Sequence, residues 1–417
     1  MEVMPKTRNP KSVSLVLAGI GGMGACYLDE LLSKDSGYHL NGVVDPKPQP
    51  ASRLDRIKAL GIPLHPTLED FYDKHDAELA IISSPIPEHC PQTRLALAHG
   101  SHVLCEKPVA AVIQDGRAMS QACREAERFV AVGFQWSFSP AIQELKADIL
   151  AGLYGKPQRL RCLYLWPRDE TYYRRNDWAG RVQDGLGRWV LDSPANNAMA
   201  HDLHNMLYIL GESVDKSARP VSVKAELYRA YPIQNYDTIA GRVITQDGTE
   251  ILLFFSHASA ADIGPVLSYE FEKGKVLASG RQSSLKGVFQ DGRVKDYGSP
   301  DEQPFKKLWD SLAAVRTGNP LPCGINAALS QTLCINGFQE STASIVNFPA
   351  RLLESEGQPG QRFIFVRGLE EALVLCHQLG RLPSEMRFSW ARPAVEIALG
   401  DYRTFPSACS RLLIELQ

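Results

Sequence analysis

Residues 13–24 read VSLVLAGIGGMG, an apolar run that passes directly into closely spaced glycines. The run from Val13 to Ala18 predicts a short buried strand. Gly19, Gly21 and Gly24 fit G-x-G-x-x-G, and the apolar residues that follow have helical spacing. Glycines between a strand and a helix let the backbone approach a pyrophosphate, which the N–H groups at the start of the helix can bind. The alternative is a glycine-rich turn without a ligand.

An acidic residue follows at the distance that a bound dinucleotide requires. Residues 39–44 predict a second strand, and Asp45 ends it about 20 residues beyond the last glycine. An acid there accepts hydrogen bonds from the adenosine ribose and repels a 2′-phosphate, which favours NAD. Lys47 and Arg53 keep NADP as the alternative cofactor, and Pro46 leaves open an ordinary turn acid. The predicted contacts in this part of the chain are Gly19, Ile20, Gly21, Gly22, Met23, Gly24 and Asp45.

The composition is that of an ordinary globular chain. Its 417 residues, 44% of them hydrophobic and 22% charged, predict two domains. A net charge of −2 without charge runs argues against a nucleic-acid face, and no apolar segment approaches the ~20 residues of a membrane span. The apolar stretch after the basic N-terminus is interpreted as the first strand and not as a secretion signal. Nine cysteines without C-x-x-C predict reduced thiols, a cytoplasmic protein and no structural zinc.

The first third of the chain alternates strands and helices. Strands are predicted at residues 77–82, 101–105 and 129–133, and helices at 52–60, 89–99 and 114–127. Such alternation builds a doubly wound parallel sheet, so residues 1–135 are predicted to form an α/β, Rossmann dinucleotide-binding domain. Ligands bind at the carboxyl ends of parallel strands, which brings Ser83, Ser84, Pro85 and Glu106 to the rim that carries the glycines.

Residues 136–417 are predicted to form an α+β domain with a large, open, mostly antiparallel sheet. Apolar residues alternate with polar ones over 221–227, and glycine turns at 247–248, 273–274 and 291–292 each indicate a two-residue hairpin. A capping-box pattern from Ser299 to Glu302 predicts the start of a helix. Further helices are expected at 367–378 and 386–399, without an assigned role.

Lys107 stands in Cys105-Glu106-Lys107-Pro108, immediately after a predicted strand of the parallel sheet. Pro108 keeps Lys107 in an extended conformation. Beside the positive charge of an oxidised nicotinamide, the ammonium form of a lysine is disfavoured, which lowers its pKa toward neutrality. Removal of a hydride from a CH–OH carbon also requires a base for the hydroxyl proton, and Lys107 is the candidate. The alternative is a surface lysine in a loop.

A second candidate is His201, on a helix predicted within residues 196–211. Helical spacing places Asn197, His201, Asn205 and Tyr208 on one face and apolar residues on the opposite face. His201 is therefore expected to point into the cleft between the domains. A metal site at His201 and His204 lacks a supporting carboxylate, so no metal is predicted.

Aromatic and basic residues interleave between Trp166 and Trp178. Flat rings suit the C–H faces of a sugar, while guanidinium and amide groups bind hydroxyls, or a phosphate, sulfonate or carboxylate. The alternative is an exposed loop with packed aromatic residues. The predicted substrate contacts here are Arg168, Tyr172, Arg174, Arg175, Asn176 and Trp178, together with Trp136 near the domain junction.

The glycine motif, Asp45, Glu106-Lys107-Pro108 and His201, in this order, resemble the glucose-fructose oxidoreductase / inositol dehydrogenase family, written Gfo/Idh/MocA. The resemblance implies that Lys107 is catalytic. It also implies a D-x-x-x-H pattern in the second domain, where this chain has Asn197 in place of the acid; an amide cannot ionise, so Asn197 would orient the substrate. Ser137 stands where members often carry arginine. The remaining expected contacts are Ser83, Ser84, Pro85, His89, Glu106, Lys107 and Gln135 to the cofactor, and Asn197, His201 and His204 to the substrate.

The resemblance implies reversible oxidation of a secondary alcohol on a sugar, glycoside or cyclic polyol with NAD(P), in which Lys107 and His201 handle the proton. One alternative is an NAD-dependent glycosidase that works by transient oxidation and elimination. Another is a non-catalytic NAD-binding regulatory protein, against which Lys107 and His201 argue. The expected partners are a small carbohydrate and further copies of the chain, as a dimer or tetramer formed through the open sheet, with no nucleic acid and no membrane.

Overall fold

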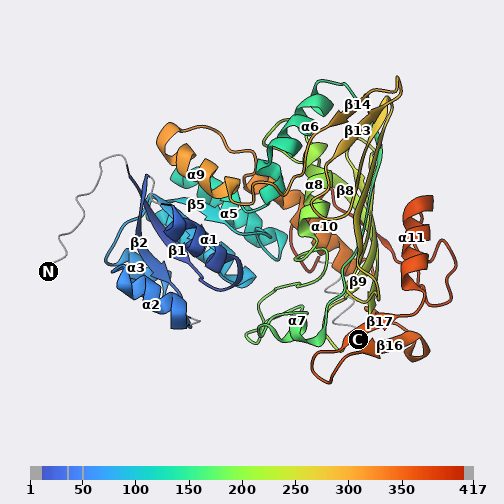
Figure 1. Cartoon of the computed structure of the whole chain (residues 1–417), viewed down its shortest axis with the longest axis horizontal. Coiled ribbons are helices and arrows are strands. Elements are labelled where there is room, and N and C mark those ends of the chain that lie inside the picture. The colour runs from blue at the N-terminus through green and yellow to red at the C-terminus, as the bar shows by residue number, and fades with distance from the viewer. Residues whose placement is uncertain (1–11, 35–36, 49–50, 408–417) are drawn as a thin grey trace.

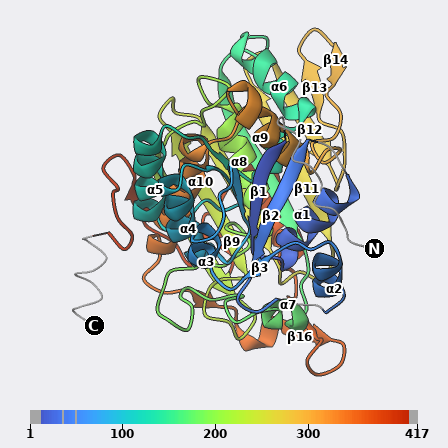
Figure 2. The same ribbon diagram turned by 90° about the vertical axis from the view of Figure 1, so that its left-hand side faces the viewer.

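The computed structural model describes residues 12–34, 37–48 and 51–407. A parallel sheet with its helices lies beside a much larger open sheet, which Figure 1 shows nearly edge-on. Figure 2, turned by 90°, places the parallel sheet in front of the open one. The predicted fold class, a Rossmann domain followed by an α+β domain, is confirmed.

The N-terminal sheet has six parallel strands in the order β3-β2-β1-β4-β5-β6. All residues of the central strand β1 (Val13–Ala18) are buried, because helices cover both faces of the sheet. The strand order reverses between β1 and β4 (Leu79–Ile82), the place where such sheets bind dinucleotides. The other elements are α1 (Gly22–Ser33), β2 (Tyr38–Val44), α2 (Ala51–Ala59), β3 (Leu64–His65), α3 (Leu68–Tyr72), α4 (Ile86–Ala98), β5 (His102–Cys105), α5 (Ile113–Ala126) and β6 (Val130–Val132).

The predicted strands and helices of this domain are all present. The largest difference concerns α4, which starts at Ile86 although the helix was expected from residue 89. Pro85 is its N-cap and Pro87 lies in its first turn, where helical N–H groups lack partners and proline is tolerated. The prolines therefore belong to the start of the helix and not to the preceding loop.

The second sheet has ten strands and is mostly antiparallel. Its order is β14-β13-β12-β11-β7-β10-β9-β8-β15, with β18 also paired to β8, and β7 runs parallel to β10. The elements that build it and lie on its inner side are η1 (Gln135–Phe138), α6 (Pro140–Leu150), β7 (Pro157–Leu165), α7 (Glu170–Arg174), α8 (Ala200–Ile209), β8 (Pro220–Arg229), β9 (Thr238–Thr245), β10 (Glu250–Ser256), β11 (Ile263–Phe271), β12 (Gly274–Ser279), β13 (Lys286–Phe289), β14 (Val294–Asp296), β15 (Val346–Asn347) and β18 (Glu396–Ala398).

The three glycine turns of this sheet connect antiparallel strands, as predicted. The hairpin at 273–274 has a two-residue loop, as predicted, but the loop is Glu272 and Lys273, and Gly274 is the first residue of β12. The other two loops are one residue longer, and each ends in a glycine with positive φ, 81° at Gly248 and 86° at Gly292. A hairpin loop of this length needs a left-handed residue at its end, which is the role of these glycines.

The capping-box pattern from Ser299 to Glu302 does not start a helix, so that prediction is wrong. The pattern forms a local turn instead, in which the Ser299 N–H donates to the Glu302 carboxylate at 3.4 Å. The helix α9 (Lys306–Thr317) begins only after Pro304. Proline has no N–H to bond a carbonyl one turn earlier, so a helix from residue 299 would be interrupted there.

Two helices from beyond the predicted domain boundary at residue 135 pack back onto the parallel sheet. α9 contacts β1 and β5, and α10 (Ile325–Glu340) contacts α5. Asn336 of α10 accepts a hydrogen bond from the Ile113 N–H at 2.8 Å and donates one to the Ala111 carbonyl at 2.9 Å. The rim of the parallel sheet is therefore joined firmly to residues far along the chain.

The C-terminal segment covers the face of the open sheet that points away from the parallel sheet (Figure 1). Its elements are η2 (Ala350–Leu352), β16 (Leu353–Glu356), β17 (Phe363–Val366) and α11 (Leu369–Leu379). Leu373 and Cys376 of α11 are buried in a second apolar core with Phe254 of β10. The helix expected at 386–399 is wrong: Pro393 lies within it, and Glu396–Ala398 instead extends the sheet as β18.

The C-terminal segment covers the face of the open sheet through which a homo-oligomer was expected to form. α11 packs on β7 and β10, at the centre of the face that would meet a second copy. A homo-oligomer, whether dimer or tetramer, would have to include α11 in its interface or use another surface. The oligomeric state stays a prediction.

Three structural properties limit the chemistry of the described residues. Within residues 12–34, 37–48 and 51–407, no helix has the length and apolar character needed to cross a bilayer. In the same ranges no group of three His, Cys, Asp or Glu residues is placed to bind a metal ion. Eight of the nine cysteines lie in the described part, and all eight are free thiols.

Candidate active site

The glycine turn between β1 and α1 has the shape that the sequence predicts. Gly19 has φ of 83°, and a Cβ there would lie 2.7 Å from the Ser83 carbonyl oxygen. A Cβ on Gly24 would overlap the carbonyl oxygen of Gly19, so these two glycines allow strand, helix and neighbouring loop to approach each other. Gly21 differs: it is the N-cap of α1, and a Cβ there would meet nothing within 4 Å. It therefore faces open space at the positive end of the helix.

Asp45 lies beside this turn at the end of β2. Its carboxylate accepts the Ile20 N–H at 3.0 Å and the Lys47 N–H at 2.8 Å. The carboxylate is half-buried, so it keeps an accessible side for a ribose hydroxyl. A bare helix N-terminus, an uncapped Gly21 and an adjacent acid together fit the pyrophosphate and ribose of NAD.

Two glycine substitutions separate cofactor binding from folding. Gly21→Ala should leave the fold intact but raise the Kd for NAD about tenfold or more, because its methyl group would occupy the space that a phosphate needs. Gly24→Ala should instead lower the free energy of unfolding by about 1–3 kcal/mol, through the clash with Gly19. Isothermal titration with NAD and urea unfolding measure the two effects. Equal loss of NAD binding and of stability in Gly21→Ala would contradict this assignment.

The predicted nicotinamide-side loop lies where β4 ends. Ser83 donates its N–H to the Ala18 carbonyl at 2.8 Å, and the Ser84 hydroxyl donates to Gln92 at 2.7 Å, while Pro85 is exposed. His89 is only 1% exposed, and its two ring nitrogens lie 2.8 Å from the Pro108 carbonyl and 3.0 Å from the Ser84 carbonyl. His89 therefore ties this loop to the segment that carries Lys107. That burial corrects the expected direct contact of His89 with the cofactor.

Glu106 forms a buried ion pair that no sequence pattern indicated. Its carboxylate accepts hydrogen bonds from Lys307 of α9, from the Tyr27 hydroxyl at 2.6 Å and from the Lys107 N–H at 3.1 Å. Burial alone would raise the pKa of Glu106, but the ammonium of Lys307 and the other donors lower it below its ordinary value. Glu106 is 6% exposed, so it acts as an internal anchor, which departs from the expected cofactor contact.

Lys107 reaches across from the parallel sheet to the second domain. Its ammonium donates to the backbone carbonyl of Asn197 at 2.7 Å and to the Asn197 side-chain oxygen at 3.3 Å. Burial lowers the pKa of Lys107 to about 8; Lys307 and Arg175 act in the same direction, while Glu106 and Asp192 oppose them. Lys107 is thus held by two neutral carbonyl oxygens and gives up its proton near neutral pH.

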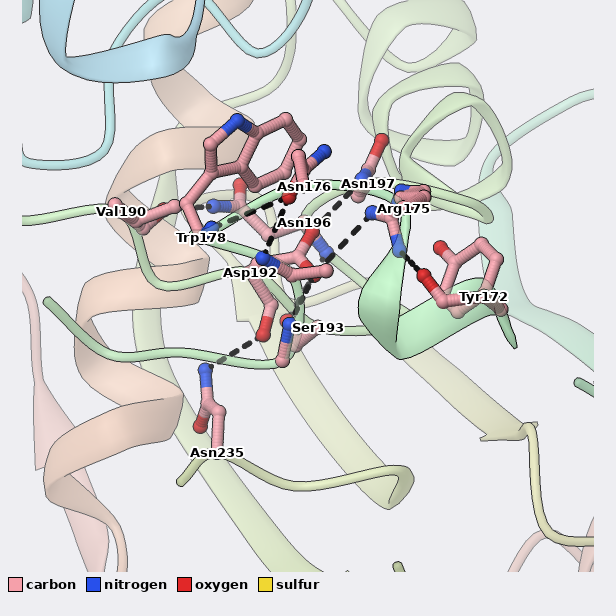
Figure 3. Close-up of polar contacts among 12 residues, drawn as sticks. Tyr172, Arg175, Asn176, Trp178, Val190, Asp192, Ser193, Asn196, Asn197 and Asn235 are labelled. Carbon is pink, nitrogen blue, oxygen red and sulfur yellow. Dashed lines mark hydrogen bonds and ion pairs between the residues drawn. The ribbon is translucent and has the colours of Figure 1, made fainter. Parts of the chain in front are cut away.

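Asp192 is the centre of the polar network drawn in Figure 3. Asp192 is 2% exposed. Its carboxylate accepts hydrogen bonds from the Asn197 side-chain N–H at 2.7 Å, from the Gly180 N–H at 2.6 Å and from the Arg175 guanidinium at 3.4 Å. A carboxylate only accepts, so it fixes the NH₂ end of the Asn197 amide and turns the oxygen toward Lys107. The sequence reasoning missed Asp192, which precedes the predicted helix and has no motif of its own.

His201 lies on a helix, as predicted, but in the first turn of α8, against the aromatic rings of Trp136 and Phe134. Burial lowers its pKa well below the ordinary value, and the charge of Lys107 adds to this, so the imidazole is neutral. Its Nδ1 is buried without a hydrogen-bond partner. Trp136 keeps its ring toward His201 while its indole N–H donates to Asp301 at 2.7 Å. Gln135, at the start of η1, is half-buried.

The predicted polar face of α8 does not exist as such. His204, Asn205 and Tyr208 are each 0% exposed, because elements pack against every side of the helix. His204 stacks on Phe134, and its Nε2 lies 3.0 Å from the Ser137 hydroxyl. This placement in the core corrects the expected substrate contact of His204. Asn197 lies before the start of α8, in a turn, and not on the helix.

The aromatic and basic stretch forms a cluster at the carboxyl end of β7. The Arg168 guanidinium lies over the rings of Trp166, at 3.6 Å, and Tyr172, at 4.6 Å. Arg175 lies over Tyr172 at 3.8 Å and over Trp178 at 5.2 Å. Because Arg175 also bonds Asp192, this cluster is continuous with the Lys107 network.

Two residues of this stretch are used locally. Arg174 is exposed and lies against the Glu170 carboxylate and the Gly360 carbonyl of the β16–β17 hairpin, so its substrate contact stays a prediction. The Asn176 side-chain oxygen accepts the N–H groups of Trp178 and Ala179, at 3.2 and 2.8 Å, and so closes a turn.

The fold and the site define a two-domain dinucleotide-binding protein in which a half-buried lysine, Lys107, meets the second domain at the cofactor rim. Residues 13–134 match the model of a family described as "Oxidoreductase family, NAD-binding Rossmann fold". The match covers the N-terminal domain, which is an NAD-binding Rossmann domain, and the second domain lies outside it.

Curated proteins that are similar to the chain include inositol dehydrogenases. The chain is 27% identical over 356 residues to the inositol 2-dehydrogenase of Pseudomonas fluorescens, which spans 82% of this chain and 98% of that enzyme. It is 30% identical over 181 residues to inositol 2-dehydrogenase 1 of Mycolicibacterium vanbaalenii, 42% of this chain and 50% of that one. Apart from the Pseudomonas enzyme, the similarity covers about half the length of most of these relatives.

Solved structures share the fold. The WlbA dehydrogenase of Chromobacterium violaceum, in complex with NADH and UDP-GlcNAcA, has a TM-score of 0.67 and 20% identity, covering 88% of this chain and 99% of that one. Levoglucosan dehydrogenase, in complex with NADH and levoglucosan, has a TM-score of 0.66 and 16% identity, covering 80% and 97%. At these identities the similarity establishes the architecture.

Proposed function

We propose that this protein is an NAD-dependent dehydrogenase that oxidises or reduces a secondary alcohol or ketone of a sugar or cyclic polyol. The observation that carries the proposal is Lys107, which lies on the cofactor rim with a pKa lowered to about 8 and with its ammonium held against Asn197. The inositol dehydrogenases and the levoglucosan dehydrogenase among the similar proteins act on such alcohols by name.

Each residue has a definite part in this chemistry. NAD⁺, when bound, supplies the hydride acceptor. Neutral Lys107 takes the hydroxyl proton of the alcohol through its Nζ, and in the reverse direction its ammonium returns that proton. Asn197, fixed by Asp192, holds Nζ in place through neutral oxygens and so leaves the lysine able to act as a base. His201, neutral and packed on Trp136, offers the same hydroxyl a second polar contact.

The two alternatives have less support. The relatives and solved structures described above are dehydrogenases by name, and none of them is a glycosidase. A regulatory NAD-binding protein would have no need for a half-buried lysine whose pKa is lowered and whose neighbour Asn197 is fixed by the buried Asp192.

A panel assay distinguishes the three functions. We expect NAD⁺ and one of several polyols, myo-inositol and free sugars included, to give NADH absorbance in proportion to product. Release of an aryl aglycone from a glycoside without net NADH would establish the glycosidase in its place. Binding of NAD, measured by calorimetry, without turnover of any polyol or glycoside would favour the regulatory protein.

A further inference from the structure

Arg168 is a partly buried cation without an acidic partner. Its guanidinium lies 3.6 Å from the ring centroid of Trp166 and 4.6 Å from that of Tyr172. Within the described residues it makes no ion pair, and its Nε is buried without an acceptor. Burial lowers the pKa of Arg168; Tyr172 and Tyr164 oppose this, while the nearby Arg175 and Arg281 act in the same direction as burial. A desolvated guanidinium in this setting gains from an anion that binds it.

The other arginines of the cluster are already neutralised. Arg175 pairs with Asp192 at 3.4 Å. Arg281, which lies over the Trp166 ring at 4.3 Å, pairs with Asp262. One unit of positive charge is therefore left over in this part of the site, and it belongs to Arg168.

The stacking decides which atoms of Arg168 remain available. Aromatic rings contact the flat face of the guanidinium, whereas its N–H groups project in the plane, toward the edges. Two parallel in-plane N–H groups match the two oxygens of a carboxylate. A single uncompensated charge also suits a monoanion better than a phosphate dianion.

A second buried atom without a partner lies in the same cluster. His257 is 1% exposed, and its ring packs against that of Tyr172 with centroids 5.3 Å apart. Its Nδ1 lies 2.9 Å from the Trp166 carbonyl, which can only accept, so Nδ1 carries the proton and Nε2 is a buried acceptor without a donor. A ligand that offers both a carboxylate and hydroxyl groups is complementary to these two side chains.

We propose that the substrate is a sugar acid whose carboxylate binds Arg168 at the carboxyl end of β7, while its reacting hydroxyl lies at Lys107. The two ends are linked through one network, since Arg175 packs on the same Tyr172 ring as Arg168 and bonds Asp192, which fixes Asn197 beside Lys107. The inference rests on the proposed function, because it adds a charged group to the alcohol that the enzyme oxidises.

The test compares three probes on the NAD-loaded protein: glucuronate, glucose 6-phosphate and glucose. Binding is followed by tryptophan fluorescence, because Trp166 and Trp178 lie in the cluster, and therefore does not depend on turnover. We expect glucuronate to bind most tightly, and Arg168→Gln to weaken it by about tenfold to a hundredfold, as loss of a charge-assisted pair does. Arg168→Lys should bind glucuronate more tightly than Arg168→Gln but less tightly than the wild type, because an ammonium cannot bind both carboxylate oxygens in one plane.

Arg174→Gln is the matched control, because Arg174 is an exposed arginine of the neighbouring helix α7 and should leave glucuronate binding unchanged. Thermal unfolding and NAD binding of each variant show whether it is folded. The proposal is overturned if glucuronate shows no binding, if glucose or glucose 6-phosphate binds as tightly, or if folded Arg168→Gln binds glucuronate like the wild type. Turnover of neutral polyols without a preference for glucuronate would remove this inference alone. Glucuronate binding that depends on Arg168, without NADH formation from glucuronate or from any polyol, would remove the proposed function and leave only the carboxylate site at Arg168.

Discussion

Replacing Lys107 by methionine should lower kcat for alcohol oxidation by about 10²–10⁴-fold, the usual contribution of a general base. Methionine keeps most of the side-chain volume but cannot accept a proton. NAD binding should fall far less than kcat, because Lys107 is only one of the expected cofactor contacts and the variant keeps the glycine turn and Asp45. Stopped-flow measurement of NADH formation, together with calorimetric titration of NAD, tests both parts of this prediction.

The pH dependence makes the test specific for a base. Oxidation needs neutral Lys107, and its pKa is lowered to about 8, so kcat/KM should rise with pH and level off above that value. Lys107→Met should lose this rise. Lys216→Met, a change at an exposed lysine paired with Glu212, should keep both the rate and the pH profile of the wild type. A wild-type profile that is flat between pH 6 and 9 would show that Lys107 is not the base.

Replacing Lys307 by methionine should be the most damaging single change to stability. Lys307 and Glu106 are 1% and 7% exposed at their side chains, and the variant would leave the Glu106 carboxylate buried without its cation. Breaking one side of a buried pair costs about 3–5 kcal/mol of unfolding free energy. Urea unfolding followed by circular dichroism measures the loss.

The neighbouring lysine supplies the control. Lys306 pairs with Asp310 on the same helix at partly exposed positions, so Lys306→Met should cost at most about 1 kcal/mol. Adding Glu106→Gln to Lys307→Met should restore part of the stability, because the unpaired charge is then removed. If Lys307→Met is no less stable than Lys306→Met, the buried pair does not anchor α9 to the parallel sheet.

The pH also affects this pair in a defined direction. The pKa of Glu106 is lower in the folded protein than its ordinary value of 4.5. The ionised carboxylate therefore stabilises the fold fully above pH 4.5, and this stabilisation is lost as the pH falls through the lowered pKa of the folded state. The difference in stability between the wild type and Lys307→Met should therefore shrink in acid.

Local patterns in the sequence were enough to predict the cofactor half of the site. A strand, a glycine turn and a helix adjoin each other in the chain, and Asp45 ends the next strand, so each of these residues is placed by its own neighbours. Lys107 could be predicted for the same reason, because it follows β5 directly and parallel strands end at one rim.

The substrate half could not be predicted in the same way. Helical spacing placed Asn205 and Tyr208 on the same polar face as His201, but burial depends on what packs around α8, and here the helix is enclosed. Asp192 has no recognisable motif, and its importance follows only from its contacts with Asn197, Arg175 and Gly180.

The sequence by itself determined the α/β class, the strand that begins it, the glycine turn, Asp45 and the position of Lys107, since these depend on residues close together in the chain. Only the tertiary structure decided which side chains neutralise the charge of Glu106 and which hold Lys107 in place. Glu106 and Lys307 are 201 residues apart, and Lys107 and Asn197 are 90 apart. Which distant side chains meet depends on how helices and sheets pack, and periodicity within a segment carries no information about its partner.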